Sequence, residues 1–172
     1  MPKMIAAMTE LAVSLVALWF LTFLSAFMHE LGHAIGYTLA TGDKHWHIRV
    51  GWGKQLLNTK KLTVNLIVLD GSFTPLEQKI DTRAKLISML SGGPIVSLLL
   101  VAGFLALRFA GSSFQSDFFT DSAIKWFLNF PLFGNLFILL FSLAPCHYFW
   151  GKIKGLESDG LQIIHALKKD GA

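Results

Sequence analysis

Three long runs without Asp, Glu, Lys or Arg dominate this sequence of 172 residues and extend over 11–28, 86–107 and 126–151. About twenty apolar residues in a helix cross the hydrocarbon layer of a bilayer. The chain is 15% charged, whereas typical soluble domains contain about 25% charged residues. We therefore expect an α-helical integral membrane protein with three transmembrane helices, over about 11–40, 86–107 and 123–145.

Lys and Arg are unequally distributed around these predicted helices. Eight of the fifteen lie between the first and second helices and four follow the third, whereas only Lys3, Arg108 and Lys125 lie on the other side. Cytoplasmic segments of membrane proteins carry such an excess. We expect a multi-pass protein of the cell membrane, with its N-terminus outside and its C-terminus cytoplasmic. The net charge of +4 is then explained by topology and by contact with the lipid bilayer, so no nucleic-acid partner is expected. The first run is too long for a signal-peptide core and is expected to remain as an uncleaved helix.

A short motif, His29-Glu30-Leu31-Gly32-His33, follows directly on the first apolar run. Positions i and i+4 of a helix share a face, so His29 and His33 could bind one Zn²⁺ ion. Glu30 lies beside the first ligand, where its carboxylate can accept a proton from a water molecule that the metal activates. Ionisable residues at membrane depth are functional by default. The motif therefore predicts a catalytic zinc site, in preference to polar residues that reach out to the membrane surface.

A catalytic zinc ion usually has three protein ligands and one open position. Side-chain chemistry alone leaves several candidates for the third ligand. They are His45, His47, Cys146, His147, Asp159 and His165.

The segment between the first two helices differs from the rest of the chain. A small β element is predicted over about 45–71, with strands at 45–50 and 62–68. Gly51, Gly53 and the polar residues 55–61 would form the turn between the strands, and Asp70-Gly71 a second turn. The strand 62–68 is a candidate for binding an extended substrate, because an edge strand presents free N–H and C=O groups. Its residues are Leu62, Thr63, Val64, Asn65, Leu66, Ile67 and Val68.

The second predicted helix begins with Gly92, Gly93 and Pro94, followed by Ser97. Two glycines and a proline favour close helix packing, a kink or both. A polar outer loop is expected at about 111–121. At the other end of the chain, a cytosolic helix is predicted over about 159–169, with Ser158 as its N-cap.

These motifs together resemble the site-2-protease family of intramembrane zinc metalloproteases (peptidase family M50), over nearly the whole chain. Gly93-Pro94-Ile95-Val96-Ser97 is similar to the family's motif on its second core helix. Ser142-Leu143-Ala144-Pro145 and Asp159-Gly160 are similar to the motifs at and after the end of the third. The resemblance implies one core domain over 1–172, in a compact form without a PDZ or CBS domain. It also implies Zn²⁺ as cofactor, Asp159 as the third ligand beside His29 and His33, and Glu30 as the catalytic base.

Two departures from the family pattern concern the site. The family has an Asn, which supports the oxyanion, where this chain has Ser142; Asn135 lies two helical turns earlier and could substitute. Thirteen residues separate Pro145 from Asp159, more than is usual in the family, so Asp159 is expected on a separate element after the third helix.

The expected function is hydrolysis of a peptide bond in or near a transmembrane segment or a signal-peptide remnant. The partner would be a transmembrane protein or peptide substrate; the sequence leaves its identity and the oligomeric state open. One alternative is a non-catalytic metal-binding subunit of a membrane exporter, which would not need Glu30. Another is a zinc hydrolase with a non-peptide substrate, because the motif specifies an activated water and not an amide.

Overall fold

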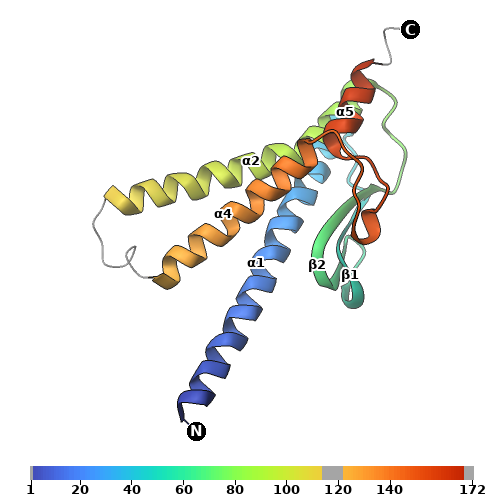
Figure 1. The fold of residues 1–172 in the computed structure, drawn as a ribbon. Coiled ribbons are helices and arrows are strands. Elements are labelled where there is room, and N and C mark those ends of the chain that lie inside the picture. The colour runs from blue at the N-terminus through green and yellow to red at the C-terminus, as the bar shows by residue number, and fades with distance from the viewer. Residues whose placement is uncertain (1, 114–121, 169–172) are drawn as a thin grey trace.

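The computed structural model describes residues 2–113 and 122–168. Three long helices, a two-stranded antiparallel sheet and a short C-terminal helix make up this part of the chain (Figure 1). In chain order the elements are α1 (Pro2–Thr41), β1 (Trp46–Asn58), β2 (Leu62–Pro75), α2 (Arg83–Ser113), α4 (Ser122–Leu143), the 3-10 turn η1 (Gly151–Ile153) and α5 (Asp159–Lys168).

The three long helices are each apolar and long enough to cross a membrane, as expected for the fold class. Helix α1 begins earlier than predicted, and α2 extends at both ends beyond 86–107. Helix α4 agrees with the expected 123–145 to within two residues. Of the predicted outer loop, residues 111–113 belong to α2 and 114–121 lie outside the described residues. The tail helix α5 matches the prediction, apart from residue 169, which also lies outside.

The two ends of α1 have different surroundings. Its N-terminal part extends away from α2 and α4, and most of its described side chains up to Phe20 are exposed (Figure 1). Its C-terminal part, which carries the His-Glu motif, packs against α2, α4 and the sheet. The motif therefore lies where all the main elements meet.

Glycines allow α1 and α2 to pack closely at the level of the motif. A Cβ atom on Gly92 of α2 would collide with the backbone of Gly32 of α1, at 2.6 Å from its carbonyl carbon. One turn further along α1, Gly36 approaches Ser88, whose hydroxyl donates a 3.1 Å hydrogen bond to the Gly36 carbonyl. The close packing predicted for the Gly-Gly-Pro segment is confirmed, with Pro94 inside α2.

The sheet is longer than expected, because two glycines bend β1 instead of ending it. Gly51 and Gly53 adopt positive φ angles of 78° and 85°, a region that favours glycine. The strand continues to Asn58, so the predicted turn at 55–61 shrinks to the connection at 59–61. The turn predicted at Asp70-Gly71 is also wrong, because both residues lie within the strand β2 and Gly71 pairs with Val50 of β1.

The bend folds β2 around the first half of β1. Ile48 lies opposite Phe73 on one side and beside Leu62 on the other, and Val50 likewise contacts Gly71 and Val64. The first half of β1 is therefore the interior of the sheet, with the two ends of β2 on either side.

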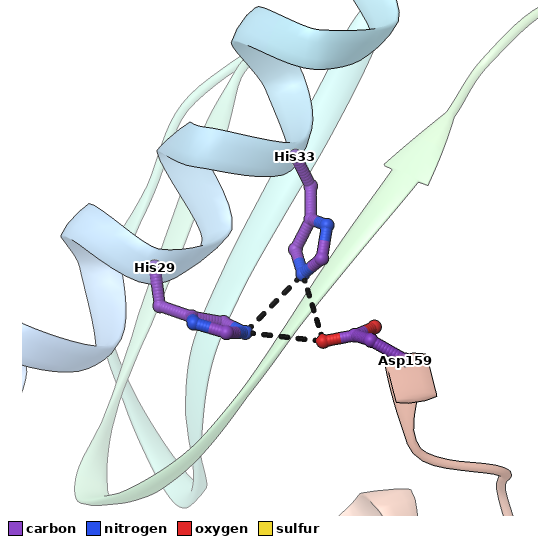
Figure 2. A group of neighbouring side chains, drawn as sticks. All are labelled: His29, His33 and Asp159. Carbon is purple, nitrogen blue, oxygen red and sulfur yellow. Dashed lines mark hydrogen bonds and ion pairs between the residues drawn. The ribbon is translucent and has the colours of Figure 1, made fainter. Parts of the chain in front are cut away.

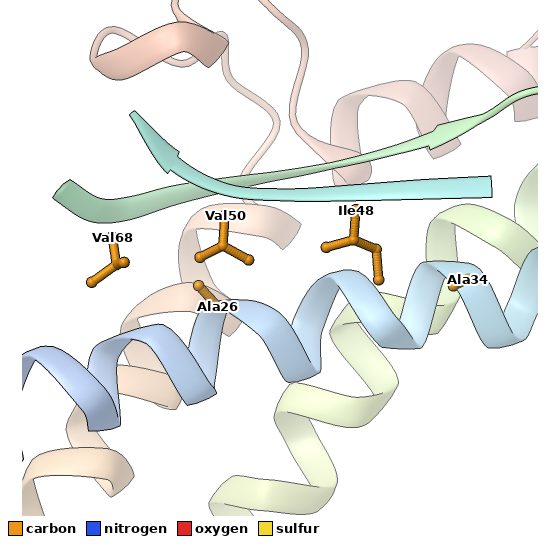
Figure 3. Packing of buried hydrophobic residues seen from close by; sticks show 5 residues of the cluster. All are labelled: Ala26, Ala34, Ile48, Val50 and Val68. Atoms are coloured by element: carbon orange, nitrogen blue, oxygen red, sulfur yellow. The ribbon is translucent and has the colours of Figure 1, made fainter. Parts of the chain in front are cut away.

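One face of the sheet packs along α1. Ile48, Val50 and Val68 point from the sheet toward Ala26 and Ala34, which lie two turns apart on the helix (Figure 3). Alanines on this face let the strands approach the helix closely. This packing fixes the sheet beside the His-Glu motif.

Candidate metal centre

Three side chains from distant parts of the sequence converge at the centre of the molecule. His29 and His33 project from α1 toward Asp159, the first residue of α5 (Figure 2). The Nε2 atoms of the two histidines are 3.2 Å apart, and each lies 3.4 Å from Oδ2 of Asp159. All three residues are buried or nearly so. The structure thus brings together the two predicted histidines and one of the six candidates for the third ligand.

These distances match the requirements of a tetrahedral metal ion. Ligand atoms at about 2.0–2.1 Å from a tetrahedral Zn²⁺ ion lie about 3.3 Å from one another. The space between the ligands is also kept open by a glycine, since a Cβ atom on Gly93 would lie 2.8 Å from Nε2 of His29. The cluster can therefore hold a metal ion, and two imidazoles with one carboxylate are a donor set that suits zinc.

The second nitrogen of each imidazole is held by α2. Nδ1 of His29 is 2.9 Å from Oγ of Ser97, and Nδ1 of His33 is 2.9 Å from the backbone oxygen of Met89. The Met89 carbonyl can only accept, so Nδ1 of His33 donates to it and Nε2 points toward His29 and Asp159. Such outer contacts orient metal-binding histidines in proteins. Ser97, predicted as part of a packing motif, thus also orients a candidate ligand.

Asp159 reaches the site through a loop formed by residues 146–158. The two arms of this loop are joined by backbone hydrogen bonds, from Tyr148 to Leu156 and from Ser158 to Cys146, each 2.9 Å long. Because the two arms pair, the thirteen residues between Pro145 and Asp159 form a hairpin-like loop that leads the chain back to the end of α4. Ser158 then caps α5, where its Oγ accepts a 3.2 Å hydrogen bond from the Leu161 N–H, as predicted.

The charge of Asp159 suits a metal ligand. Burial alone would raise the pKa of Asp159, but hydrogen bonds from His29 and His33 outweigh burial and lower the pKa to about 2. The carboxyl group is therefore ionised at neutral pH, which is the form that binds a cation.

Glu30 lies in the wall of a cavity of about 600 Å³ that also contains the three ligand residues. The Glu30 side chain is buried and lies against Gly71 of β2, where a Cβ atom would be 2.7 Å from its Cγ. The sequence predicts a turn at Gly71, whereas the structure has Gly71 in a strand, where the absence of a side chain leaves room for Glu30.

The segment 62–68 is a free edge only in part. Thr63 lies beside Arg49 and opposite Asn58, and Val64 likewise has a β1 partner on each side, whereas Asn65 and Ile67 each have one. Among the described residues, 71–75 pair with no strand other than β1, so their other side is an edge. Gly71, Ser72 and Phe73 line the cavity. The bend at Gly51 and Gly53, which the sequence did not reveal, causes this difference.

Neither residue predicted to support an oxyanion offers a free donor to the cavity. Asn135 is not among the described lining residues; its Nδ2 donates to Ser25 of α1 at 3.0 Å and to the Pro131 carbonyl at 2.8 Å. Ser142 does line the cavity, but its hydroxyl donates to the Leu139 carbonyl at 3.1 Å. Asn135 therefore joins α4 to α1, and Ser142 is bonded within its own helix.

The five other candidate ligands lie elsewhere and have other contacts. His47 contacts Thr63, and His147 and His165 face Glu157 at 4.0 and 3.2 Å. Cys146 is in the 146–158 loop, where its backbone pairs with Ser158.

His45 belongs to a second group of potential ligands, with Asp43 and Glu77. The ammonium group of Lys79 already lies among them, with its Nζ atom 2.8 Å from Glu77 and 3.5 Å from Asp43. Burial opposes ionisation of Asp43, but hydrogen bonds from Tyr37 and His45 keep its pKa well below the usual range. This group is an ion-paired network at the end of α1.

Two residues of the cavity were missed by sequence reasoning, Tyr148 and Asp70. Both line the cavity, and Asp70 accepts hydrogen bonds from Arg49 and from the backbone of Lys152, each 2.9 Å long. The loop between Pro145 and Asp159 is longer than is usual in the site-2-protease family, and this extra length is the sequence signal for a functional residue such as Tyr148.

No family model, curated protein or solved structure matches the chain, so the interpretation of this centre rests on its own residues.

Proposed function

We propose that this protein is a membrane-embedded zinc metalloprotease of the site-2-protease type. The observation that carries the proposal is the buried group of His29, His33 and Asp159, at ligand spacing, with Glu30 in the same cavity. The three long apolar helices support a location in the membrane. The excess of Lys and Arg supports a cytoplasmic location for the segment between α1 and α2 and for the C-terminal helix α5.

The residues of the chain divide the reaction among them. His29, His33 and Asp159 hold the metal, which when bound lowers the pKa of a water molecule and polarises a carbonyl group. Glu30 accepts a proton from the attacking water and passes it to the amine that leaves when the C–N bond breaks. Ser97 and the Met89 carbonyl keep the imidazoles in the orientation that this requires.

The edge at 71–75 provides a place for an unwound substrate. A transmembrane helix hides its peptide bonds in internal hydrogen bonds and must open before it can be cleaved. The opened backbone needs new partners, at a cost of a few kcal/mol for each group left unpaired. The free N–H and C=O groups of 71–75 can supply them, and Gly71 brings this edge directly against Glu30.

Burial of Glu30 favours an enzyme over a metal-binding subunit of an exporter. A carboxylate in a largely apolar cavity is costly unless it interacts with charged groups. Binding of the metal by two histidines and Asp159 does not need Glu30, whereas hydrolysis does. The position of Glu30 is therefore explained by catalysis.

The experiment that tests the function is a comparison of wild-type protein with Glu30→Gln. The substitution removes the proton acceptor and keeps the size of the side chain, so metal content and folding should remain. Membrane proteins that copurify with Glu30→Gln would be sequenced, and their lengths compared in cells that contain either form. We expect full-length partners with Glu30→Gln and shortened ones with the wild type. Equal lengths in both kinds of cell would refute proteolysis and leave the exporter alternative.

The position of the edge strand can be tested in the same cells. A photo-crosslinking residue at Ser72, on the edge, should attach to the trapped partner in the Glu30→Gln background. The same residue at Gln55, exposed on β1, serves as the control. Crosslinks from Gln55 and none from Ser72 would rule out binding along this edge.

A further inference from the structure

The proposed reaction needs a hydrogen-bond donor for the carbonyl oxygen of the scissile bond. As water adds to the carbonyl carbon, this oxygen gains negative charge, and preorganised donors that face it lower the barrier. The two candidates from the sequence do not fit this role. Both N–H groups of the Asn135 amide are used within the bundle, and the Ser142 hydroxyl is bonded to its own helix.

Tyr148 in the 146–158 loop has the properties that those residues lack. Its side chain lines the cavity that contains Glu30 and the three ligand residues. Among the described residues, none forms a hydrogen bond with its hydroxyl, although the backbone on both sides is well fixed. The Tyr148 N–H donates to Leu156 at 2.9 Å, and the Tyr148 carbonyl accepts from Gly155 at 2.7 Å.

The ring and the loop are held in place by two further contacts. The Tyr148 ring lies 5.9 Å from that of Trp150, which packs in turn on Phe141 of α4 at 5.2 Å. At the tip of the loop, the buried carboxylate of Asp70 accepts a 2.9 Å hydrogen bond from the Lys152 N–H. The loop is therefore fastened both to α4 and to the strand that leads into the proposed substrate edge.

The surroundings of Tyr148 keep it a donor. Burial raises the pKa of the Tyr148 phenol above its ordinary value of about 10. The phenol is thus protonated at neutral pH, so its O–H group is available to an acceptor that enters the cavity.

We propose that Tyr148 is a catalytic residue whose hydroxyl donates a hydrogen bond to the carbonyl oxygen of the bond being cleaved. This inference rests on the proposed function. In the reaction, the water oxygen bonds to the carbonyl carbon, Glu30 takes the water proton, and the charge on the carbonyl oxygen is stabilised by Tyr148. The C–N bond then breaks, the amine receives the proton from Glu30, and Tyr148 keeps its own proton throughout.

The first test replaces Tyr148 by Phe, which removes the hydroxyl and retains the ring that packs on Trp150. With a substrate identified by the Glu30→Gln trap, kcat should fall by about 10²-fold or more, the usual loss of one such donor, while KM and zinc content stay near wild type. Phe149→Leu is the matched control on the same loop, because Phe149 is 71% exposed and does not line the cavity. Ser142→Ala tests the competing donor and should change kcat by less than about 3-fold.

The second test measures binding instead of activity. N-phosphoryl-Leu-Phe-amide has a tetrahedral anionic group that imitates the developing oxyanion, whereas N-acetyl-Leu-Phe-amide has a planar carbonyl. Analogues of a transition state bind at least about 10²-fold more tightly than substrates. Calorimetry on the zinc-loaded protein in detergent should show that Tyr148→Phe lowers the affinity for the phosphoryl compound by 10-fold or more. The affinity for the acetyl compound should stay unchanged.

The outcomes separate the two proposals. Unchanged kcat and phosphoryl binding in Tyr148→Phe, with hydrolysis still dependent on Glu30, would overturn the role of Tyr148 alone. Loss of zinc from Tyr148→Phe would show that the residue only supports the loop, which also overturns it. Absence of Glu30-dependent hydrolysis by the wild type would overturn the proposed function and this inference with it.

Discussion

The ligands of the candidate metal centre come from two regions that are built in different ways. His29 and His33 lie one turn apart on α1, so the geometry of the helix itself places them on one face. Asp159 is 126 residues after His33 and reaches the same point through α4 and the paired loop 146–158. The first region needs only a helix, whereas the second needs the folded protein.

This difference determines how each region depends on its neighbours. The histidines require α2, because Ser97 and Met89 orient their rings and Gly93 leaves room for an ion. Asp159 requires the end of α4 and the contact from Asp70 to the loop. A change at the α1–α2 contact should therefore disturb the whole centre, and a change in the loop mainly its third ligand.

The largest effect is expected from Gly92→Ala. A methyl group there collides with the backbone of Gly32, so the two helices must separate, at a cost of about 1–3 kcal/mol or more. Thermal unfolding in detergent and zinc analysis should show a destabilised protein with little metal. Gly103→Ala is the matched control on α2, because a Cβ atom there meets nothing within 4 Å. The free energy of unfolding of Gly103→Ala should equal that of the wild type or exceed it by up to about 1 kcal/mol, because alanine has the higher helix propensity. Similar behaviour of the two variants would contradict the close contact.

Asp159→Ala should remove the third ligand and leave the two helices in place. We expect zinc affinity to fall by more than about 100-fold, beyond the usual loss from an outer contact. Competition with a chelator of known affinity gives the measurement, and helix content by circular dichroism checks the fold. His147→Ala, nearby on the loop but facing Glu157, should retain wild-type affinity. If His147→Ala loses the metal and Asp159→Ala keeps it, the ligand assignment is wrong.

Ser97→Ala should have a smaller effect on the histidine side of the centre. Without the contact to Nδ1 of His29, zinc affinity should fall by about 10- to 100-fold. The same titration measures it. Met89→Leu is an informative control, because Met89 contacts His33 through its backbone carbonyl, which the substitution retains. Equal losses in both variants would indicate general damage to α2.

Asp70→Asn should have the smallest effect on metal binding and act on the loop. The amide keeps an acceptor but loses the charge that pairs with Arg49 at 2.9 Å, which should cost the loop about 1.5–3 kcal/mol. Hydrogen exchange at the Tyr148 and Gly155 amides should become faster, with less than about 10-fold loss of zinc affinity. Glu157→Gln, whose ion pairs with histidines are partly exposed, should change exchange little. Unchanged exchange in Asp70→Asn would show that this contact does not hold the loop.

The local patterns were predictable from the sequence, because their causes lie within a few residues. Long apolar runs require helices, and the spacing of His29 and His33 places both on one face. Ser158 before Asp159 predicted the cap of α5, and the two glycines of α2 predicted close packing. Each of these depends on backbone geometry or composition alone.

The remaining features depend on contacts between residues far apart in the chain, which a single sequence does not reveal. The bend at Gly51 and Gly53 gives residues 63–64 of the predicted edge a partner on both sides, and residues 71–75 form a further edge at the cavity. Chemistry alone left six candidates for the third ligand, and only the pairing of the 146–158 loop brings Asp159 within 3.4 Å of both histidines. The sequence by itself determined three apolar helices and a histidine pair. Tertiary packing decided that Asp159, residues 71–73 of the strand edge and Tyr148 line the same cavity as the two histidines. Contacts between residues far apart in the chain place these groups, and a single sequence does not show such contacts.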